Sequence, residues 1–557
     1  MSFGELLLQR RKITAEQLEQ ALAARKGPHD RVERILIQLG FAKERDILEL
    51  YGEQLSIPVV DLTQVQIDCD LLKQVPSKIV HRYRLVPIDR HNGTIRVATS
   101  NPFDLYALDE LRMLTGTKIE TVLAAETDIQ RVIQQYYGVG GQTVEDMIQS
   151  SDVEVISEAS DDARDLIEEA QEATVVKLVN EILVEALRDR ASDVHIEPFE
   201  HDLKIRYRVD GVLHTTNVPP QIRRFQNAII SRIKILSNLN IAEKRLPQDG
   251  SFKIKAGNRD IDLRVSIIPG AFGECVVLRI LDKQSVLLSL GDLGMTGPTY
   301  DRFRTLIDMP HGIVLVTGPT GSGKTTTLYS ALNTIKTDEI KILTVEDPIE
   351  YFLDGVNQVQ IKPKIGLTFA HGLRSFLRHD PDVILVGEIR DRETADVAVN
   401  AALTGHLVFS TLHTNDSATA NTRLLDMGVE PFLVASSIEG VLAQRLIRTV
   451  CKECKEAYTP DRHKMPTDLK LEPGQKLYRG TGCRECRNTG FRGRIGIFEL
   501  LSMTDDLREL ILERASAAKL IECGRKHGLV LLREDGWDKV RQGFTTPEEI
   551  LRVTKAG

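Results

Sequence analysis

Polar and apolar positions alternate over the first 54 residues with the spacing of short amphipathic helices. An apolar stripe at Leu6, Leu7 and Leu8 is followed by the helical pattern TAEQLEQALAAR. The same arrangement returns 29 residues later, in RILIQ and then KERDILELYGEQ. This weak internal repeat predicts two tandem helix pairs.

The pattern becomes mixed over residues 55–140. The segment VHRYRLVPIDRHNGTIRVAT predicts a β-hairpin that turns at Asn92-Gly93, because Asn-Gly suits the tight turns that join antiparallel strands. The segments LDELRMLTG and ETDIQRVIQQYYG have helical spacing. We therefore expect a small α/β region after the helical repeat.

Residues 173–290 begin with apolar positions at helical spacing and continue as alternating strands. In one strand Ile205 and Tyr207 point to one side and Arg206 to the other, before a turn at Asp210-Gly211. From about Met295 strands and helices alternate, which predicts an α/β domain with a mostly parallel sheet. Helical patterns close the chain after residue 499.

Composition and charge narrow the class of protein. Apolar residues make up 42% of the 557 positions and charged residues 27%, as in ordinary globular chains. No apolar run approaches the roughly 18 residues of a membrane helix. The start MSFGELLLQRRKIT lacks the apolar core of a signal peptide. We expect a cytoplasmic protein without direct membrane insertion, so any role at a membrane would come through a partner.

The acidic balance is local. Residues 145–172 carry 11 acidic side chains and one basic one, so the rest of the chain has a net charge of +2 against −8 overall. This stretch is interpreted as a solvated linker. A near-neutral remainder provides no broad basic surface, which argues against nucleic acid as a partner.

The segment Gly318-Pro319-Thr320-Gly321-Ser322-Gly323-Lys324-Thr325 fits the phosphate-loop pattern GxxxxGK[ST]. It lies between a predicted strand, IVLV, and a predicted helix, as this pattern requires. The glycines let backbone N–H groups surround a phosphate, Lys324 reaches the β- and γ-phosphates, and the Thr325 hydroxyl can bind Mg²⁺. The alternative, a simple glycine-rich turn, does not account for this context.

Two further apolar strands end in carboxylates, ILTVEDP at Glu346 and VILVGE at Glu388. Ligands bind at the carboxyl ends of parallel strands, and hydrolysis needs a carboxylate near Mg²⁺ and a group that orients water. Histidines follow at His406 and, after the strand LVFSTL, at His413, which is a candidate contact of the γ-phosphate. Each carboxylate alone also fits a surface acid at the end of a strand, and a lone histidine is more often structural.

Two arginines and four cysteines are also candidates for chemistry. Arg279 interrupts an apolar strand and Arg264 projects opposite Leu263, so each needs a ligand or an ion pair, such as one with Asp262. Two CxxC pairs stand 28 residues apart and together supply four thiolates, which suits a closed, structural Zn²⁺ site. A redox dithiol is the alternative. The predicted ligands are Cys451, Cys454, Cys483 and Cys486.

Together these segments resemble the secretion ATPase superfamily, in the branch of type II secretion and type IV pilus extension. The motifs are PTGSGKTTTLY, ILTVEDPIEY, LRHDPDVILVGEIRDRETA and AALTGHLVFSTLHTNDS, with ASDVHIEP, IRYRVDGVL and AEKRLPQDGSFKI upstream. The resemblance covers residue 173 to the C-terminus strongly and the preceding residues more faintly. One departure is His379, where the family pattern has Gln.

The resemblance implies a role for each matching residue. Glu346 would activate water, Glu388 would serve Mg²⁺, and Arg264 and Arg279 would reach the γ-phosphate. His406 and His413 would form the family's histidine box, with His413 among the catalytic residues. The implied nucleotide contacts are Gly318, Gly321, Ser322, Gly323, Lys324, Thr325, Thr326 and His406.

Residues 1–54 resemble a domain of this family that binds cyclic di-GMP through two tandem motifs. The second copy keeps Arg31, Gly40 and Gln54 but has Glu33 in place of a glycine, and the first copy keeps only Gly4. A carboxylate at Glu33 would repel a dianionic ligand, so the departures argue against cyclic di-GMP binding. The alternative is a helical module that docks on a membrane partner.

The resemblance implies a multidomain α/β protein with a RecA-like phosphate-loop core, a preceding α+β domain, a zinc-binding insert and an N-terminal helical and α+β region. It implies a cytoplasmic homohexameric ATPase that drives assembly of pilin-like subunits with an inner-membrane platform protein and an adaptor. A retraction motor and a nucleic-acid-translocating ATPase are the alternatives. The expected domains are a docking domain at 1–140, an acidic linker at 141–172, an arginine-supplying domain at 173–290 and an ATPase domain at 291–557 with the tetracysteine element at 451–486.

Overall fold

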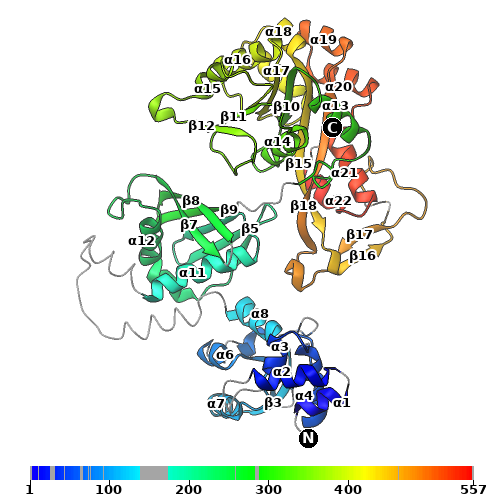
Figure 1. Cartoon of the computed structure of the whole chain (residues 1–557). Helices are drawn as coiled ribbons and strands as arrows, with labels where there is room; N and C mark the ends of the chain where they lie inside the picture. The colour runs from blue at the N-terminus through cyan, green and yellow to red at the C-terminus, as the bar shows by residue number, and fades with distance from the viewer. Residues whose placement is uncertain are drawn as a thin grey trace. The chain divides into compact units, whose positions relative to one another are not determined.

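The computed structural model describes residues 3–10, 12–24, 32–42, 44–137, 173–256, 259–282 and 288–554, apart from short gaps at 63–64, 66, 73–74, 76, 92, 462 and 464. The chain forms two compact units, Met1–Ala256 with Asp262–Ile280, and Gly257–Ile261 with Leu281–Gly557 (Figure 1). The predicted acidic linker lies outside the described residues. Among the described helices, none has the length and apolar character needed to cross a membrane.

The N-terminal repeat folds as the two predicted helix pairs. Its helices are α1 (Phe3–Gln9), α2 (Ala15–Ala23), α3 (Val32–Gln38) and α4 (Glu44–Leu55). Leu7 and Leu36, one from each copy, are fully buried in a shared core. Glu33 accepts a hydrogen bond of 2.6 Å from the hydroxyl of Tyr51, so its carboxylate is engaged within the repeat.

A three-stranded sheet follows the repeat, in the order β1-β2-β3. The predicted hairpin is confirmed, with β1 (Leu85–His91) antiparallel to β2 (Thr94–Thr99). β3 (Lys118–Leu123) lies parallel to β2. The helices of this part are α5 (Cys69–Leu72), α6 (Ser77–Tyr83), α7 (Leu105–Thr115) and α8 (Glu126–Tyr137).

The rest of the first unit has a six-stranded sheet in the order β6-β5-β4-β9-β8-β7. The alternation in β5 is confirmed, because Ile205 and Tyr207 are fully buried, and the Tyr207 hydroxyl donates to the backbone oxygen of Ile182 at 3.0 Å. The elements are α11 (Ala173–Arg188), β4 (Asp193–Pro198), β5 (Leu203–Val209), β6 (Val212–Thr216), η1 (Pro220–Phe225), α12 (Gln226–Leu236), β7 (Gln248–Ala256), β8 (Arg259–Gly270) and β9 (Gly273–Asp282).

The second unit is built on a seven-stranded sheet in the order β12-β11-β13-β14-β10-β15-β18. Neighbouring strands are parallel, except that β18 runs antiparallel to β15. The strands are β10 (Gly312–Thr317), β11 (Ile342–Glu346), β12 (Asn357–Gln360), β13 (Val383–Val386), β14 (Leu407–Leu412), β15 (Ile438–Val450) and β18 (Phe491–Ser502). The predicted α/β fold is confirmed.

Helices cover both faces of this sheet. Ile313 and Leu315 of β10 face one apolar core and Val314 and Val316 face another, as expected where successive side chains point to opposite faces of a buried strand. The helices are α13 (Gly297–Ile307), α14 (Lys324–Ile335), α15 (Phe369–Phe376), α16 (Arg392–Leu403), α17 (Ser417–Asp426), α18 (Pro431–Ser437), α19 (Asp505–Leu512), α20 (Ala517–Lys526), α21 (Leu532–Arg541) and α22 (Pro547–Val553), with a short η2 (Pro363–Ile365).

A small element is inserted in the chain between β15 and β18, the last two strands of the sheet. β15 and β18 extend as a long ribbon toward β16 (Lys455–Tyr458) and β17 (Leu477–Gly480), which pair with each other (Figure 1). The turns η3 (Lys452–Cys454) and η5 (Arg484–Cys486) carry the two CxxC pairs.

Candidate functional site

The phosphate loop connects the carboxyl end of β10 to the first residue of α14. Its glycines at 318, 321 and 323 have φ of 151°, 77° and 90°, in the region that favours glycine. A Cβ on Gly318 would lie 2.5 Å from the backbone oxygen of Gln444 and 2.6 Å from the Ser322 hydroxyl. The loop is therefore packed too closely against β15 to accept a side chain there.

Lys324 and Ser322 give this loop the chemistry of a phosphate site. The Lys324 ammonium donates to the backbone oxygens of Gly318 at 2.9 Å and Pro319 at 3.1 Å. Burial lowers the pKa of Lys324, against the opposing charge of Glu388. Ser322 is buried, and its hydroxyl has no hydrogen-bond partner among the described residues. A polyanionic phosphate group fits these donors.

Glu346 ends β11 and is only 3% exposed. Its Oε1 accepts hydrogen bonds from the Thr344 hydroxyl at 2.5 Å and from Gln358 Nε2 at 3.1 Å, and its Oε2 accepts from the Tyr329 hydroxyl. Burial, followed by the charge of Glu346, raises the pKa of Tyr329 far above its ordinary value. Tyr329 therefore stays protonated and keeps donating.

Glu388 follows β13 at the same edge of the sheet. It forms an ion pair with Arg390, and its Oε2 lies 3.2 Å from Nε2 of His413, which follows β14. The Glu388 side chain is 13% exposed. The structure thus brings the phosphate loop, Glu346, Glu388 and His413 to the carboxyl ends of adjacent parallel strands.

His406 lies at the opposite end of β14 from His413. It precedes β14, where its backbone oxygen accepts from the first residue of β10, Gly312, at 3.2 Å. Its Nδ1 lies 2.9 Å from the backbone oxygen of Ala401. A strand of this length has its two ends about 20 Å apart. Within one chain His406 is therefore separated from the phosphate loop, and the sequence pattern that groups it with His413 does not reflect a shared position.

Two residues of β15 that the sequence analysis did not single out also contact the loop region. Gln444 is buried and accepts from the Thr327 hydroxyl at 2.7 Å. Arg445 donates to the backbone oxygen of Asn415 at 2.8 Å, and burial lowers the pKa of Arg445. Their proximity depends on β15 lying beside β10, which no local pattern in the sequence reveals.

Arg264 and Arg279 belong to the first unit, on β8 and β9. Arg279 donates to Asp193 of the adjacent strand β4 at 3.1 Å, and its side chain remains 56% exposed. The ion pair considered from the sequence therefore exists for Arg279, with Asp193 as the acid.

The four cysteines of the CxxC pairs converge. The sulfurs of Cys451 and Cys483, of Cys454 and Cys486, and of Cys483 and Cys486 are each 3.7 Å apart. These separations exceed a disulfide bond of about 2 Å. They match the edge of about 3.8 Å that four sulfurs at about 2.3 Å from a tetrahedral zinc would have. The cluster fits a structural zinc ion.

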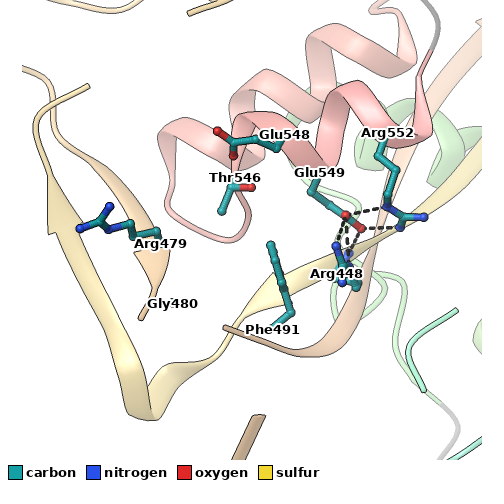
Figure 2. Close-up of a pocket in the computed structure, with 8 residues that line it drawn as sticks. All are labelled: Arg448, Arg479, Gly480, Phe491, Thr546, Glu548, Glu549 and Arg552. Carbon is teal, nitrogen blue, oxygen red and sulfur yellow. Dashed lines mark hydrogen bonds and ion pairs between the residues drawn. The ribbon is translucent and has the colours of Figure 1, made fainter. Parts of the chain in front are cut away.

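A cavity of about 330 Å³ lies between this element and α22 (Figure 2). Figure 2 shows Glu549 joined to Arg448 and Arg552, while Glu548 on the same helix points away from them. Burial alone would raise the pKa of Glu549, but hydrogen bonds from Arg552 and Arg448 outweigh it and hold the pKa below its ordinary value. No residue of the phosphate loop lines this cavity, which is bordered by the ion pairs of the buried Glu549 with Arg448 and Arg552.

Comparison with known proteins agrees with this geometry. The family model "Type II/IV secretion system protein" matches residues 168–552 and the model "MshEN domain" matches residues 55–143. The type IV pilus assembly ATPase PilB of Myxococcus xanthus is 43% identical over 558 residues, 99% of this chain and 98% of that protein. Type II secretion system protein E of Xanthomonas campestris pv. campestris is 43% identical over 561 residues, with the same coverage. The ATPase DotB of Legionella pneumophila matches with a TM-score of 0.50 at 24% identity over 67% of this chain and 94% of its own, which supports the fold alone.

Proposed function

The chain belongs to the type II/IV secretion system protein family and is an ATPase, and from this premise we propose that it is a hexameric motor of the cytoplasm. ATP hydrolysis would drive the assembly of pilin-like subunits, for type II secretion or for type IV pilus extension. The observation that carries the proposal is that the carboxyl ends of the parallel strands carry a phosphate loop, Glu346 and Glu388. The chain is also similar along 99% of its length to proteins of both pathways.

The residues at this edge divide the work of hydrolysis. Loop N–H groups and Lys324 bind the β- and γ-phosphates. Thr325 and Glu388 would hold Mg²⁺, which supplies positive charge at the phosphates when bound. Glu346 would orient and deprotonate the attacking water, and His413, which contacts Glu388, would reach the γ-phosphate. Gly321, Ser322, Gly323 and Thr326 complete the nucleotide contacts.

Arg264 and Arg279 would stabilise the charge that develops on the γ-phosphate. They belong to a different unit from the phosphate loop, so this role would require that the arginines be supplied to the phosphate site from another unit or from a neighbouring subunit. Hydrolysis would then move the units against each other. Such movement could push on an inner-membrane platform protein, with an adaptor holding the ring at the membrane.

The four cysteines would hold a structural zinc ion, which shapes the element between β15 and β18. For the N-terminal repeat we propose docking on a partner protein rather than binding of cyclic di-GMP. The carboxylate of Glu33, which accepts a hydrogen bond from Tyr51, would repel a dianionic ligand of that kind.

The test uses full-length Glu346→Gln, expressed and cross-linked in its native cell, with Lys324→Ala as the matched variant in which nucleotide binding is weakened. Mass spectrometry identifies the captured membrane proteins. A single-span adaptor with a periplasmic arm supports type II secretion, and a polytopic platform protein with pilus-alignment proteins supports pilus extension. Capture of nucleic acid, or of no inner-membrane protein by either variant, would refute the proposed role.

A further inference from the structure

Glu346 is a buried carboxylate bound by three donors that come from three different elements. Tyr329 is on α14, the helix that begins at the phosphate loop, Thr344 is on β11 itself, and Gln358 is on the edge strand β12. β12 lies beside β11 in parallel, with Thr344 directly opposite Gln358. The sheet register therefore places both Oε1 donors on the same side of the carboxylate.

The donors that hold Glu346 are themselves fixed. Gln358 Oε1 accepts from the backbone N–H of Leu353 at 2.7 Å, which leaves its Nε2 as the donor toward Glu346. That Nε2 also lies 3.3 Å from the Tyr329 hydroxyl. The Tyr329 ring packs edge-on against Tyr351, with ring centres 4.6 Å apart. The carboxylate is thus surrounded by side chains that have little freedom to turn.

A carboxylate has about four acceptor positions, two on each oxygen. In Glu346 the described donors occupy two on Oε1 and one on Oε2. We propose that Tyr329, Thr344 and Gln358 are positioning residues that leave one acceptor position on Oε2, so that this oxygen alone takes the proton of the attacking water. The inference deepens the proposed function, because it rests on the role of Glu346 in hydrolysis.

The helix α14 gives this arrangement a connection to the nucleotide. Tyr329 lies five residues beyond Lys324 on the same helix, about one and a half turns away. The residue that binds the phosphates and the residue that orients Glu346 are therefore parts of one rigid element. Any rotation of α14 on nucleotide binding changes the contact that orients the catalytic carboxylate.

The test measures ATP hydrolysis and nucleotide affinity in the full-length chain. Tyr329→Phe removes only a hydroxyl, Thr344→Val replaces a hydroxyl by a methyl group of similar size, and Gln358→Leu removes the amide. Each should lower kcat about 10-fold to 100-fold, the range expected when a charged acceptor loses a donor, with nucleotide affinity within twofold of the original. Thr344→Ser restores the hydroxyl and should recover most of the rate lost in Thr344→Val. Tyr351→Phe is the matched control.

A double-mutant cycle decides whether these residues act through Glu346. In a Glu346→Gln background each further substitution should change the residual rate by less than twofold. Unchanged kcat in Tyr329→Phe and Thr344→Val, or an equal loss in both backgrounds, would overturn the inference. If Gln358→Leu does not fold, the Thr344 pair carries the test. Full activity in Glu346→Gln alone would instead contradict the proposed function, so the two failures are distinguishable.

Discussion

Replacing Glu549 by Gln should loosen the C-terminal helix α22 from the sheet. The Glu549 side chain is fully buried and accepts from the backbone N–H of Arg448 at 2.9 Å and from the guanidinium groups of Arg448 and Arg552. Gln keeps one acceptor oxygen but turns an amide N–H₂ toward donors and removes the negative charge. Glu548, next to it on the same helix, is exposed and serves as the matched control.

The magnitude follows from the exposure of the two arginines. Breaking a fully buried ion pair costs about 3–5 kcal/mol, because one charge is left without a partner. Arg448 is 18% exposed and Arg552 45% exposed, so Arg552 can turn to water, and we expect the lower end, about 3 kcal/mol. Glu548→Gln should change stability by less than about 0.5 kcal/mol, as for an ordinary surface position.

The chain contains its own reporter for this measurement. Trp537, the sole tryptophan, is 2% exposed and packs in the same apolar cluster as Ile550 of α22. Its fluorescence during urea unfolding should show a lower midpoint for Glu549→Gln than for Glu548→Gln. Because the pKa of Glu549 is lowered in the fold, its stabilisation is present above about pH 4 and is lost as the pH falls further. Equal midpoints for the two variants would refute this reasoning.

Three further outcomes are expected. Lys324→Ala should weaken nucleotide binding at least about tenfold in a titration with a fluorescent ATP analogue, and unchanged affinity would contradict its role at the phosphates. Cys454→Ser should lower the zinc content measured by elemental analysis and lower the melting temperature, whereas full metal content would remove the zinc assignment. Burial raises the pKa of Asp535 to about 6, so the charged form costs stability as the pH rises from about 4 to 6, by about 3 kcal/mol. Asp535→Asn should flatten that pH dependence of the unfolding midpoint, and an unchanged slope would contradict it.

The parts of the site that could be predicted are those written in contiguous sequence. The phosphate loop is one uninterrupted segment, and Glu346 and Glu388 each follow an apolar strand directly. The parallel fold then brings strand ends together without further information. The four cysteines could be paired with zinc chemistry because their spacing alone marks them.

The remaining contacts depend on the order of strands in the sheet. Gln444 meets Thr327 across a sequence separation of 117 residues, and Gln358 meets Glu346 because β12 lies beside β11. No periodicity within either segment encodes these neighbours. His406 shows the reverse case, since His406 and His413 are close in sequence but lie at opposite ends of β14 and are therefore separated within one chain.

The length and pairing of β15 have a mechanical consequence. Gln444 of this strand touches the phosphate loop, Arg448 holds α22, and Cys451 begins the cysteine cluster directly after the strand ends. From Gln444 to Cys451 the chain spans about 23 Å of extended backbone. Up to Arg448, before a register shift ahead of Val450, hydrogen bonds to β18 run perpendicular to the strand, so tension along this part of β15 loads them together in shear rather than one after another. A pull applied at the cysteine cluster would therefore arrive at the phosphate loop with almost no stretch in between.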